Sequence, residues 1–267
     1  MTDFPSYRRP PVAEVACALQ YTPLAEMHLA HVGRYWAAIE TDFPFIEEKP
    51  PVMEPLEVPS AAQIPLELLE RMSWPRTWFL QTDKRRLVQL QRDRFIYNWR
   101  KLAPDDAYPR YSVISDEFFE QWEKFRSVLQ DLRLVPPVPD LCELTYVNLI
   151  PQADGWNSIP EATRLFEFTA WPDQTDFLPT PTNTGALLQF EMPESAGRLR
   201  VELGTTRWEV TGDLPVLRLV LMARGTPPGE ISSYSLRSWF DVAHEWIVKG
   251  FVDLVDRRTD ELWGREA

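Results

Sequence analysis

The last long stretch of the chain carries a helical pattern of apolar residues. Between residues 235 and 264 these residues recur at steps of three and four, which places them on one face of a helix: Leu236, Phe240, Ala243, Ile247, Phe251 and Leu254. Trp239 and Trp246 widen the stripe, so this helix is expected to cross a broad apolar surface. With Ser235 as its N-cap and Gly264 as its C-terminal glycine, the pattern predicts one long amphipathic helix.

Alternation of apolar and polar residues predicts eight strands, each with one buried face. They cover residues 12–21, 77–82, 86–91, 94–99, 142–150, 186–192, 199–209 and 215–223. Further helices are expected after Thr22 as a cap with Pro23 at the first position, after Ser115 as a cap, and over residues 158–168. The Pro- and Glu-rich residues 45–65 predict an extended surface arm, which could reach a neighbouring subunit.

The predicted elements occur in the same order twice. Residues 1–140 and residues 141–267 each read as a strand, a helix, three strands and a final helix, and residues 86–96 resemble residues 198–208. Two such units predict an α+β protein whose antiparallel sheet carries its long helices on one face. A tandem saddle resembling the TATA-box-binding or helix-grip folds fits this order, with both units in one globular body.

Composition narrows the class of protein. The chain has 267 residues, 44% of them hydrophobic and 11 of them tryptophan, which is ample for a large core. A net charge of -12 disfavours a general nucleic-acid binder, because phosphate contacts need a basic face. No apolar leader or membrane-spanning segment is visible, and Cys17 and Cys142 fall in predicted strands as buried free thiols. A cytoplasmic, soluble protein without a membrane partner is therefore expected.

Several short stretches resemble a family of proteins. Residues 9–15 (RPPVAEV), 95–99 (FIYNW) and 144–150 (LTYVNLI) are similar to segments of a sporadically distributed family of uncharacterised bacterial proteins with an N-P-P-V-x-E-V start. The family's aromatic-histidine helix ending in W-G resembles the stretch that holds Phe240, His244, Phe251, Trp263 and Gly264. Where the family has R-x-G-L-R-Y-x-N, residues 141–148 are LCELTYVN and lack the arginines. The resemblance implies a common fold and no particular chemistry, and its patchy distribution is associated with accessory or defence genes.

Histidines offer two candidate sites. His28 and His31 lie three residues apart with Glu26 nearby, but a metal needs three or four ligands and no further histidine or cysteine has matching spacing. Two solvent-facing histidines and no metal are the favoured interpretation. His244, followed by Glu245, is either a general base or an edge residue, and the edge residue is favoured because no nucleophile is recognisable.

Residues 83–101 form a basic meander in an acidic protein. They hold seven basic side chains against two acidic ones, a net charge of +5, and Phe95, Tyr97 and Trp99 share one strand face by alternation. A stacking platform beside a basic rim would suit a nucleotide or single-stranded nucleic acid. The candidate ligand-binding residues are Arg92, Arg94, Tyr97, Trp99, Arg100 and Lys101. The alternative, which is favoured, packs the rings beneath a helix and pairs the arginines with the protein's own carboxylates.

Two functions follow as hypotheses. The preferred one is a non-enzymatic cytoplasmic module that binds a protein or a small ligand, as a homodimer and without a cofactor, because no phosphate loop, dinucleotide fingerprint or metalloprotease motif is present. The alternative is an accessory or defence-linked protein that binds a nucleotide or RNA through the basic meander at residues 84–101.

Overall fold

The strand patterns join into one antiparallel sheet of nine strands. The computed structural model describes residues 4–52, 75–169, 176–212 and 214–266. The sheet consists of β2 (Val12–Tyr21), β3 (Phe45–Lys49), β4 (Arg76–Leu80), β5 (Arg86–Gln91), β6 (Arg94–Arg100), β7 (Pro139–Pro151), β8 (Gly185–Glu191), β9 (Arg198–Trp208) and β10 (Leu214–Gly225). Their spatial order is β3-β4-β5-β6-β2-β7-β10-β9-β8, and each pair is antiparallel. A separate two-stranded sheet pairs β1 (Ser6–Tyr7) with β11 (Arg265–Glu266).

Strands β2 and β7 lie side by side at the centre and join the two halves of the chain into a single sheet. Their register places Val15 opposite Tyr146 and Cys17 opposite Leu144. Because side chains alternate along a strand, these residues share one face of the sheet. Val15, Cys17 and Leu144 are fully buried on that face. Cys17 and Cys142 are buried free thiols, as the sequence predicts.

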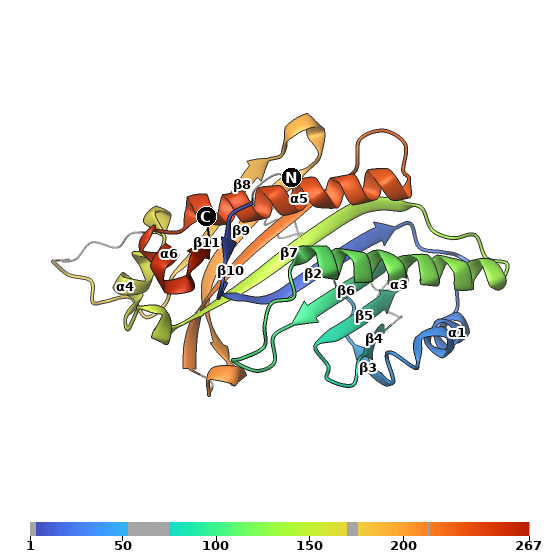
Figure 1. The fold of residues 1–267 in the computed structure, drawn as a ribbon, viewed down its shortest axis with the longest axis horizontal. Coiled ribbons are helices and arrows are strands. Elements are labelled where there is room, and N and C mark those ends of the chain that lie inside the picture. Colours follow the sequence, from blue (N-terminus) through green and yellow to red (C-terminus); the bar gives the residue numbers. More distant parts are fainter. Residues whose placement is uncertain (1–3, 53–74, 170–175, 213, 267) are drawn as a thin grey trace.

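Helices cover one face of the sheet, so the protein is an α+β protein (Figure 1). The helices are α1 (Leu29–Ile39), α3 (Tyr111–Asp131), α4 (Ile159–Thr163), α5 (Ser233–Leu254) and α6 (Arg258–Trp263), with short 3-10 turns at η1 (Gln152–Asp154), η2 (Glu167–Thr169), η3 (Pro193–Ser195) and η4 (Glu209–Thr211). Helix α3 packs over β6 and β2, and α5 packs over β7, β10 and β9. Helix α1 packs against α3.

The apolar stripes predicted for the two long helices meet above the sheet. Phe240 of α5 is fully buried, and its ring lies 5.1 Å from Phe118 and 5.7 Å from Phe119 of α3. The other predicted stripe residues buried here are Leu236, Ala243, Ile247 and Phe251 on α5, and Trp122, Phe125 and Leu129 on α3. The core between sheet and helices is therefore rich in aromatic rings.

The C-terminal helix is shorter than predicted. Helix α5 ends at Leu254 because Val255 has an extended backbone (φ -97°, ψ 146°). The side-chain Oδ1 of Asp256 then accepts a hydrogen bond from the Arg258 N–H at 2.8 Å, a local bond that competes with continued helix. A separate helix, α6, follows, and Gly264 ends it in the left-handed region (φ 66°). The prediction of one helix over residues 235–264 is wrong at this break, while Gly264 does end a helix.

The predicted caps of the two long helices are wrong by a few residues. Ser232, and not Ser235, caps α5, since its Oγ accepts from the Ser235 N–H at 3.1 Å. Helix α3 begins at Tyr111, ahead of the predicted cap Ser115, which is buried within the first turns. The buried stripe of α3 begins four residues before Ser115, because Tyr111 also faces the core.

The remaining predictions are confirmed only in part. Helix α1 starts at Leu29, and Thr22 does not cap it, because its Oγ1 donates to Asp140 Oδ2 at 3.0 Å. Of the helix predicted over residues 158–168, only α4 and η2 are helical. The predicted arm at residues 45–65 begins as β3, an edge strand of the sheet, and residues 53–65 lie outside the described residues.

Candidate functional site

The aromatic residues of the basic meander do not form an exposed platform. Tyr97 and Trp99 are only 1% and 2% exposed, and they face helix α3. The Tyr97 hydroxyl donates to Glu117 Oε2 at 2.9 Å, and the Trp99 ring lies 5.6 Å from Tyr108. Phe95, on the same face, stacks against Phe125 at 5.4 Å. The rings pack beneath a helix, which is the alternative that the sequence favours.

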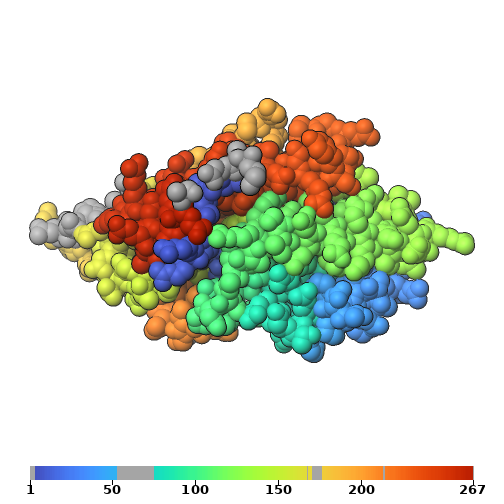
Figure 2. Space-filling model, viewed as in Figure 1, coloured from blue at the N-terminus to red at the C-terminus, as the bar shows by residue number. Residues whose placement is uncertain are grey.

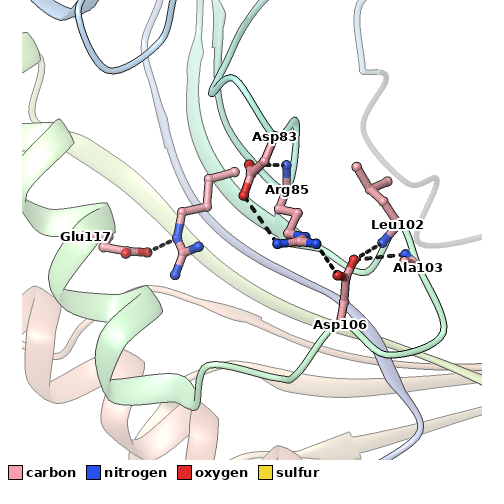
Figure 3. Close-up of polar contacts among 7 residues, drawn as sticks. Asp83, Arg85, Leu102, Ala103, Asp106 and Glu117 are labelled. Atoms are coloured by element: carbon pink, nitrogen blue, oxygen red, sulfur yellow. Dashed lines mark hydrogen bonds and ion pairs between the residues drawn. The ribbon is translucent and has the colours of Figure 1, made fainter.

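Two arginines of the meander pair with the protein's own carboxylates (Figure 3). Arg85 Nη2 lies 2.5 Å from Asp106 Oδ1, and Arg86 Nε lies 2.7 Å from Glu117 Oε2. Asp106 also accepts hydrogen bonds from the backbone N–H groups of Leu102 and Ala103, so its carboxylate closes the loop after β6. Burial raises the pKa of Asp106, but these hydrogen bonds and Arg85 outweigh it and hold that pKa below its usual range. Part of the predicted positive charge is therefore neutralised.

The other candidate residues are divided between the two faces of the sheet. Arg94 and Arg100 lie on β6 at positions that alternate with Tyr97 and Trp99, so they face away from the helices. Arg92 lies in the turn between β5 and β6, and Lys101 follows β6, where its N–H donates to the Ala13 carbonyl at 2.7 Å. The structure does not bring the aromatic and basic candidates together.

The histidine pair on α1 has a local structural role. His31 Nδ1 accepts a hydrogen bond from the His28 N–H at 3.0 Å, and this bond satisfies a backbone donor at the start of the helix. Within the described residues, no three His, Cys, Asp or Glu side chains are grouped as metal ligands would be.

A groove of about 720 Å³ lies between helices α3 and α5. Tyr146 and Asn148 of β7 form part of its floor, and Phe4 and Tyr7 of the N-terminal segment line its rim. In the space-filling view, the dark blue N-terminal segment lies between the red C-terminal residues and the green α3 (Figure 2). Segments from both ends and from the middle of the chain therefore build one site.

His244 projects from α5 into this groove. Its ring stacks on Tyr111 of α3, with centroids 4.0 Å apart and planes 10° apart. The Tyr146 hydroxyl lies 3.2 Å from His244 Nδ1, and the Tyr108 hydroxyl lies 2.9 Å from that of Tyr146. The Phe4 ring makes an edge-type contact with the imidazole, with ring centroids 5.6 Å apart. A chain of three hydrogen-bonding side chains thus runs from the loop before α3, through β7, to α5.

The groups in this chain are held in their neutral forms. Burial lowers the pKa of His244 to about 4, so its imidazole is uncharged at neutral pH. Burial raises the pKa of Tyr108, and it raises that of Tyr146 well above the usual value, with the charge and hydrogen bond of Tyr108 adding to the effect on Tyr146. Two proton arrangements are possible: His244 Nδ1 accepts from Tyr146, or it donates to Tyr146. In the first arrangement His244 Nε2 carries the hydrogen and can donate a hydrogen bond. In the second arrangement Nε2 has no hydrogen and can accept a hydrogen bond.

Ionic and polar contacts fix the walls of the groove. Arg237 Nη1 on α5 lies 3.0 Å from Asp116 Oδ1 on α3, and its guanidinium lies 4.2 Å from the Phe119 ring. The Tyr111 hydroxyl donates to Asp241 Oδ1 at 3.2 Å. These contacts link the two helices beside His244, so the width of the groove is set by side chains that also line it.

The N-terminal segment is attached to the C-terminal residues. The Arg8 and Arg9 N–H groups donate to the Gly264 and Trp263 carbonyls at 3.0 Å, and β1 pairs with β11. The Tyr7 hydroxyl donates to Asp260 Oδ1 at 3.2 Å, and its ring meets Trp263 edge-on. The rim over the groove is thus held in place by α6 and β11.

Sequence patterns found His244 but not its partners. Tyr108, Tyr111 and Tyr146 lie far apart in sequence from His244, and no fixed spacing links them. One signal was available: Tyr146 is a polar residue at a core position of a central strand, and a buried hydroxyl needs a partner. In the part of the chain that the structure describes, His244 is hydrogen-bonded to a tyrosine and to no serine or cysteine.

Comparison with protein-family models and with curated proteins finds no match to this chain. Across the described ranges, none of the helices has the length and apolar character needed to span a membrane.

Proposed function

We propose that the protein is a binding module that holds a small molecule in the groove between α3 and α5. The observation that carries this proposal is the neutral His244–Tyr146–Tyr108 chain at the wall of a preformed groove. Small-molecule sites are typically concave, largely apolar and supplied with a few well-placed polar groups. The groove has all three properties.

The size and walls of the groove define the class of ligand. A volume of about 720 Å³ lies within the usual range of pockets for drug-sized molecules. The rings of Phe4, Tyr7, Tyr111 and Phe251 line it, which favours a ligand with a flat, apolar body. The imidazole of His244 is neutral, so it favours an uncharged polar group, such as a hydroxyl, carbonyl or amide, over an anion.

The polar group of the ligand is expected to meet His244 Nε2. This nitrogen has no hydrogen bond to any of the residues described, while Nδ1 is engaged by Tyr146. Because the hydrogen bonds among His244, Tyr146 and Tyr108 can run in either direction, His244 Nε2 can act as a hydrogen-bond donor or as an acceptor while the imidazole stays neutral. A ligand bearing either kind of group can therefore be held at the same place.

The two halves of the chain are proposed to be tandem units of one plan, residues 1–140 and 141–267. The strand order supports this proposal. From the centre of the sheet outward, each half has its first strand and then its three-stranded run in reverse order: β2-β6-β5-β4 in one half and β7-β10-β9-β8 in the other. A saddle of the TATA-box-binding or helix-grip type has such a sheet, with long helices on one face. In that arrangement the groove lies where the final helices of the two units approach each other.

A fluorescence titration tests the proposed binding. The probe is N-phenyl-1-naphthylamine, an uncharged aromatic molecule that becomes fluorescent in apolar sites. Val248→Trp places a large ring in the groove, and Asp253→Trp on the exposed side of the same helix is its matched control. We expect Val248→Trp to weaken probe binding by about tenfold or more, and Asp253→Trp to leave it unchanged. Equal binding by both variants would contradict the groove as the site.

Native mass spectrometry of protein purified gently from its own host extends this test. A small molecule retained by wild type and by Asp253→Trp, but lost from Val248→Trp, would identify the natural ligand. The same spectrum reports the number of subunits, and so tests the homodimer that the sequence analysis predicts. A partner protein in place of a small molecule would instead favour an interaction module.

A further inference from the structure

Strand β8 leaves one edge of the nine-stranded sheet open. Within the described residues it pairs with β9 and with no other strand (Figure 1). The Met192 N–H, just after β8, donates to the Gly197 carbonyl at 2.8 Å. Because the backbone groups alternate in direction along a strand, those of Leu188 point toward β9, and those of Leu187 and Gln189 point outward. The outward groups form a row of donors and acceptors that a further strand would satisfy.

The side chains of β8 extend the apolar core to this open edge. Ala186 and Leu188 are partly buried and pack against the hydrophobic core. Leu187 and Phe190 are 54% and 42% exposed. Apolar side chains on an edge strand favour pairing with another strand, because pairing removes them from water while the backbone bonds form.

Charge does not protect this edge. Edge strands commonly carry charged side chains that prevent pairing with other chains. Residues 185–190 are GALLQF and contain no charged residue. Glu191 ends the strand, and its Oε1 accepts a hydrogen bond from Arg198 Nε at 2.9 Å. The charge at the end of β8 is therefore held toward β9.

The opposite edge of the sheet is unsuited to the same pairing. Strand β3 has only five residues, and three of them are Glu47, Glu48 and Lys49. A twofold axis through the middle of β3 would bring the two Glu47 side chains opposite each other, and like charges at that position are destabilising. Pairing of β3 with β8 of the next copy would repeat without closing and would form a fibre. A closed dimer is therefore expected through β8.

We propose that β8 pairs with β8 of a second copy of this chain, antiparallel and about a twofold axis at Leu188. This register uses all seven residues of the strand. The two Leu188 side chains then meet in a non-hydrogen-bonded pair, in which side chains approach most closely. Phe190 lies opposite the small Ala186 of the other copy, and Glu191 lies opposite Gly185. No like charges face each other, so the strand is complementary to itself.

The interface joins the two sheets into one and remains modest in size. Seven residues at about 3.4 Å each span about 24 Å, which is short for a permanent dimer interface. We therefore expect a reversible dimer with a Kd of about 10–100 µM. The interface does not depend on a ligand in the groove, because the groove floor lies on β7 and two strands separate β7 from β8.

Sedimentation of the full chain between about 1 and about 300 µM tests the dimer. Gln189→Pro removes one outward N–H and leaves the hydrogen bonds to β9 in place, since proline is accepted on the solvent side of edge strands. We expect its dimer Kd to rise at least about tenfold. Gln189→Val, the matched control, keeps the N–H and suits a strand, so its Kd should stay within about threefold of wild type. Wild type that remains monomeric at about 300 µM, or equal dimerisation of Gln189→Pro and wild type, would overturn the proposal.

Disulfide formation tests the register without relying on the proline variant. In the proposed pair the two Leu188 Cα atoms lie about 4.5 Å apart, within the range that a disulfide spans. Leu188→Cys should therefore form a covalent dimer under mild oxidation, while the native thiols Cys17 and Cys142 are buried. Ala186→Cys is the matched control, because a four-residue offset at about 3.4 Å per residue places its two Cα atoms about 14 Å apart.

The two cysteine variants give a clear result on a non-reducing gel. A covalent dimer from Leu188→Cys alone would support the proposed axis. Equal yields from Leu188→Cys and Ala186→Cys, or no dimer from either, would overturn it. If a strand of a different protein is the natural neighbour of β8, the purified chain stays monomeric and Leu188→Cys stays unlinked, which also contradicts the proposal.

Discussion

Replacement of Phe240 by alanine tests how the two long helices are held together. The ring is fully buried and lies 5.1 Å from Phe118, 5.7 Å from Phe119 and 5.2 Å from Trp239. A buried phenylalanine removes about 150–250 Å² from water. At about 25 cal/mol per Å² this contributes about 4–6 kcal/mol, and measured losses for Phe→Ala are about 3–5 kcal/mol. We therefore expect Phe240→Ala to lower the free energy of unfolding by about 4 kcal/mol.

Urea unfolding followed by tryptophan fluorescence measures this loss of free energy. In a separate thermal unfolding experiment, the Tm should fall by about 10 °C. Tyr234→Ala is the control, since Tyr234 lies in the first turn of the same helix and is 83% exposed, so its loss should stay within about 0.5 kcal/mol. The double variant with Phe118→Ala should show a coupling of about 1 kcal/mol. A loss below about 1 kcal/mol for Phe240→Ala would refute the tight contact between α3 and α5.

Two further predictions concern pH and backbone packing. The pKa of His244 is about 4 in the folded protein and about 6.5 in the unfolded chain, so the unfolded state takes up its proton first as the pH falls. The free energy of unfolding should drop by up to about 3 kcal/mol between pH 6.5 and pH 4. His244→Phe should remove the part of this pH dependence that comes from His244. A wild-type urea midpoint that is the same at pH 5 as at pH 7 would contradict this prediction. Gly225→Ala would place a Cβ 1.9 Å from the Ala196 carbonyl oxygen, and we expect a loss of about 3 kcal/mol or more, whereas Gly33→Ala in α1 meets open space and should gain about 0.5–1 kcal/mol. Equal thermal stability of these two glycine variants would show that the chain around Gly225 shifts freely.

Local patterns predicted the strands well because half-buried strands must alternate. Apart from Asn148 on the floor of the groove, the residues of β2 and β7 that face the helices are apolar or aromatic, and their positions follow directly from this period. The helical stripe of α5 was equally visible. Its end at Leu254 was not visible, because Val255 continues the apolar pattern. At this break a hydrogen bond from the Asp256 N–H to the distant Leu165 carbonyl acts together with the local bond from the Arg258 N–H to Asp256.

The candidate groove was beyond the reach of local patterns. His244 is adjacent to the stripe residue Ala243, and only the fold shows that Tyr111 stacks on it and that Tyr146 is hydrogen-bonded to it. Alternation along β6, in contrast, is visible in the sequence, and it places Arg94 on the face of the sheet opposite Tyr97.

Strand β2 of the first half pairs with β7 of the second half, so each half covers a strand edge that the other half would otherwise leave unpaired. Val15 and Tyr146 face each other across this central seam although more than a hundred residues separate them in the chain. During synthesis, β2 emerges long before β7, so its outer edge has free backbone donors and acceptors until the second half arrives. Loop closure over such a distance is slow compared with local hairpin formation. An isolated first half would present a ten-residue strand edge to any available strand, and another copy of itself would be the nearest match.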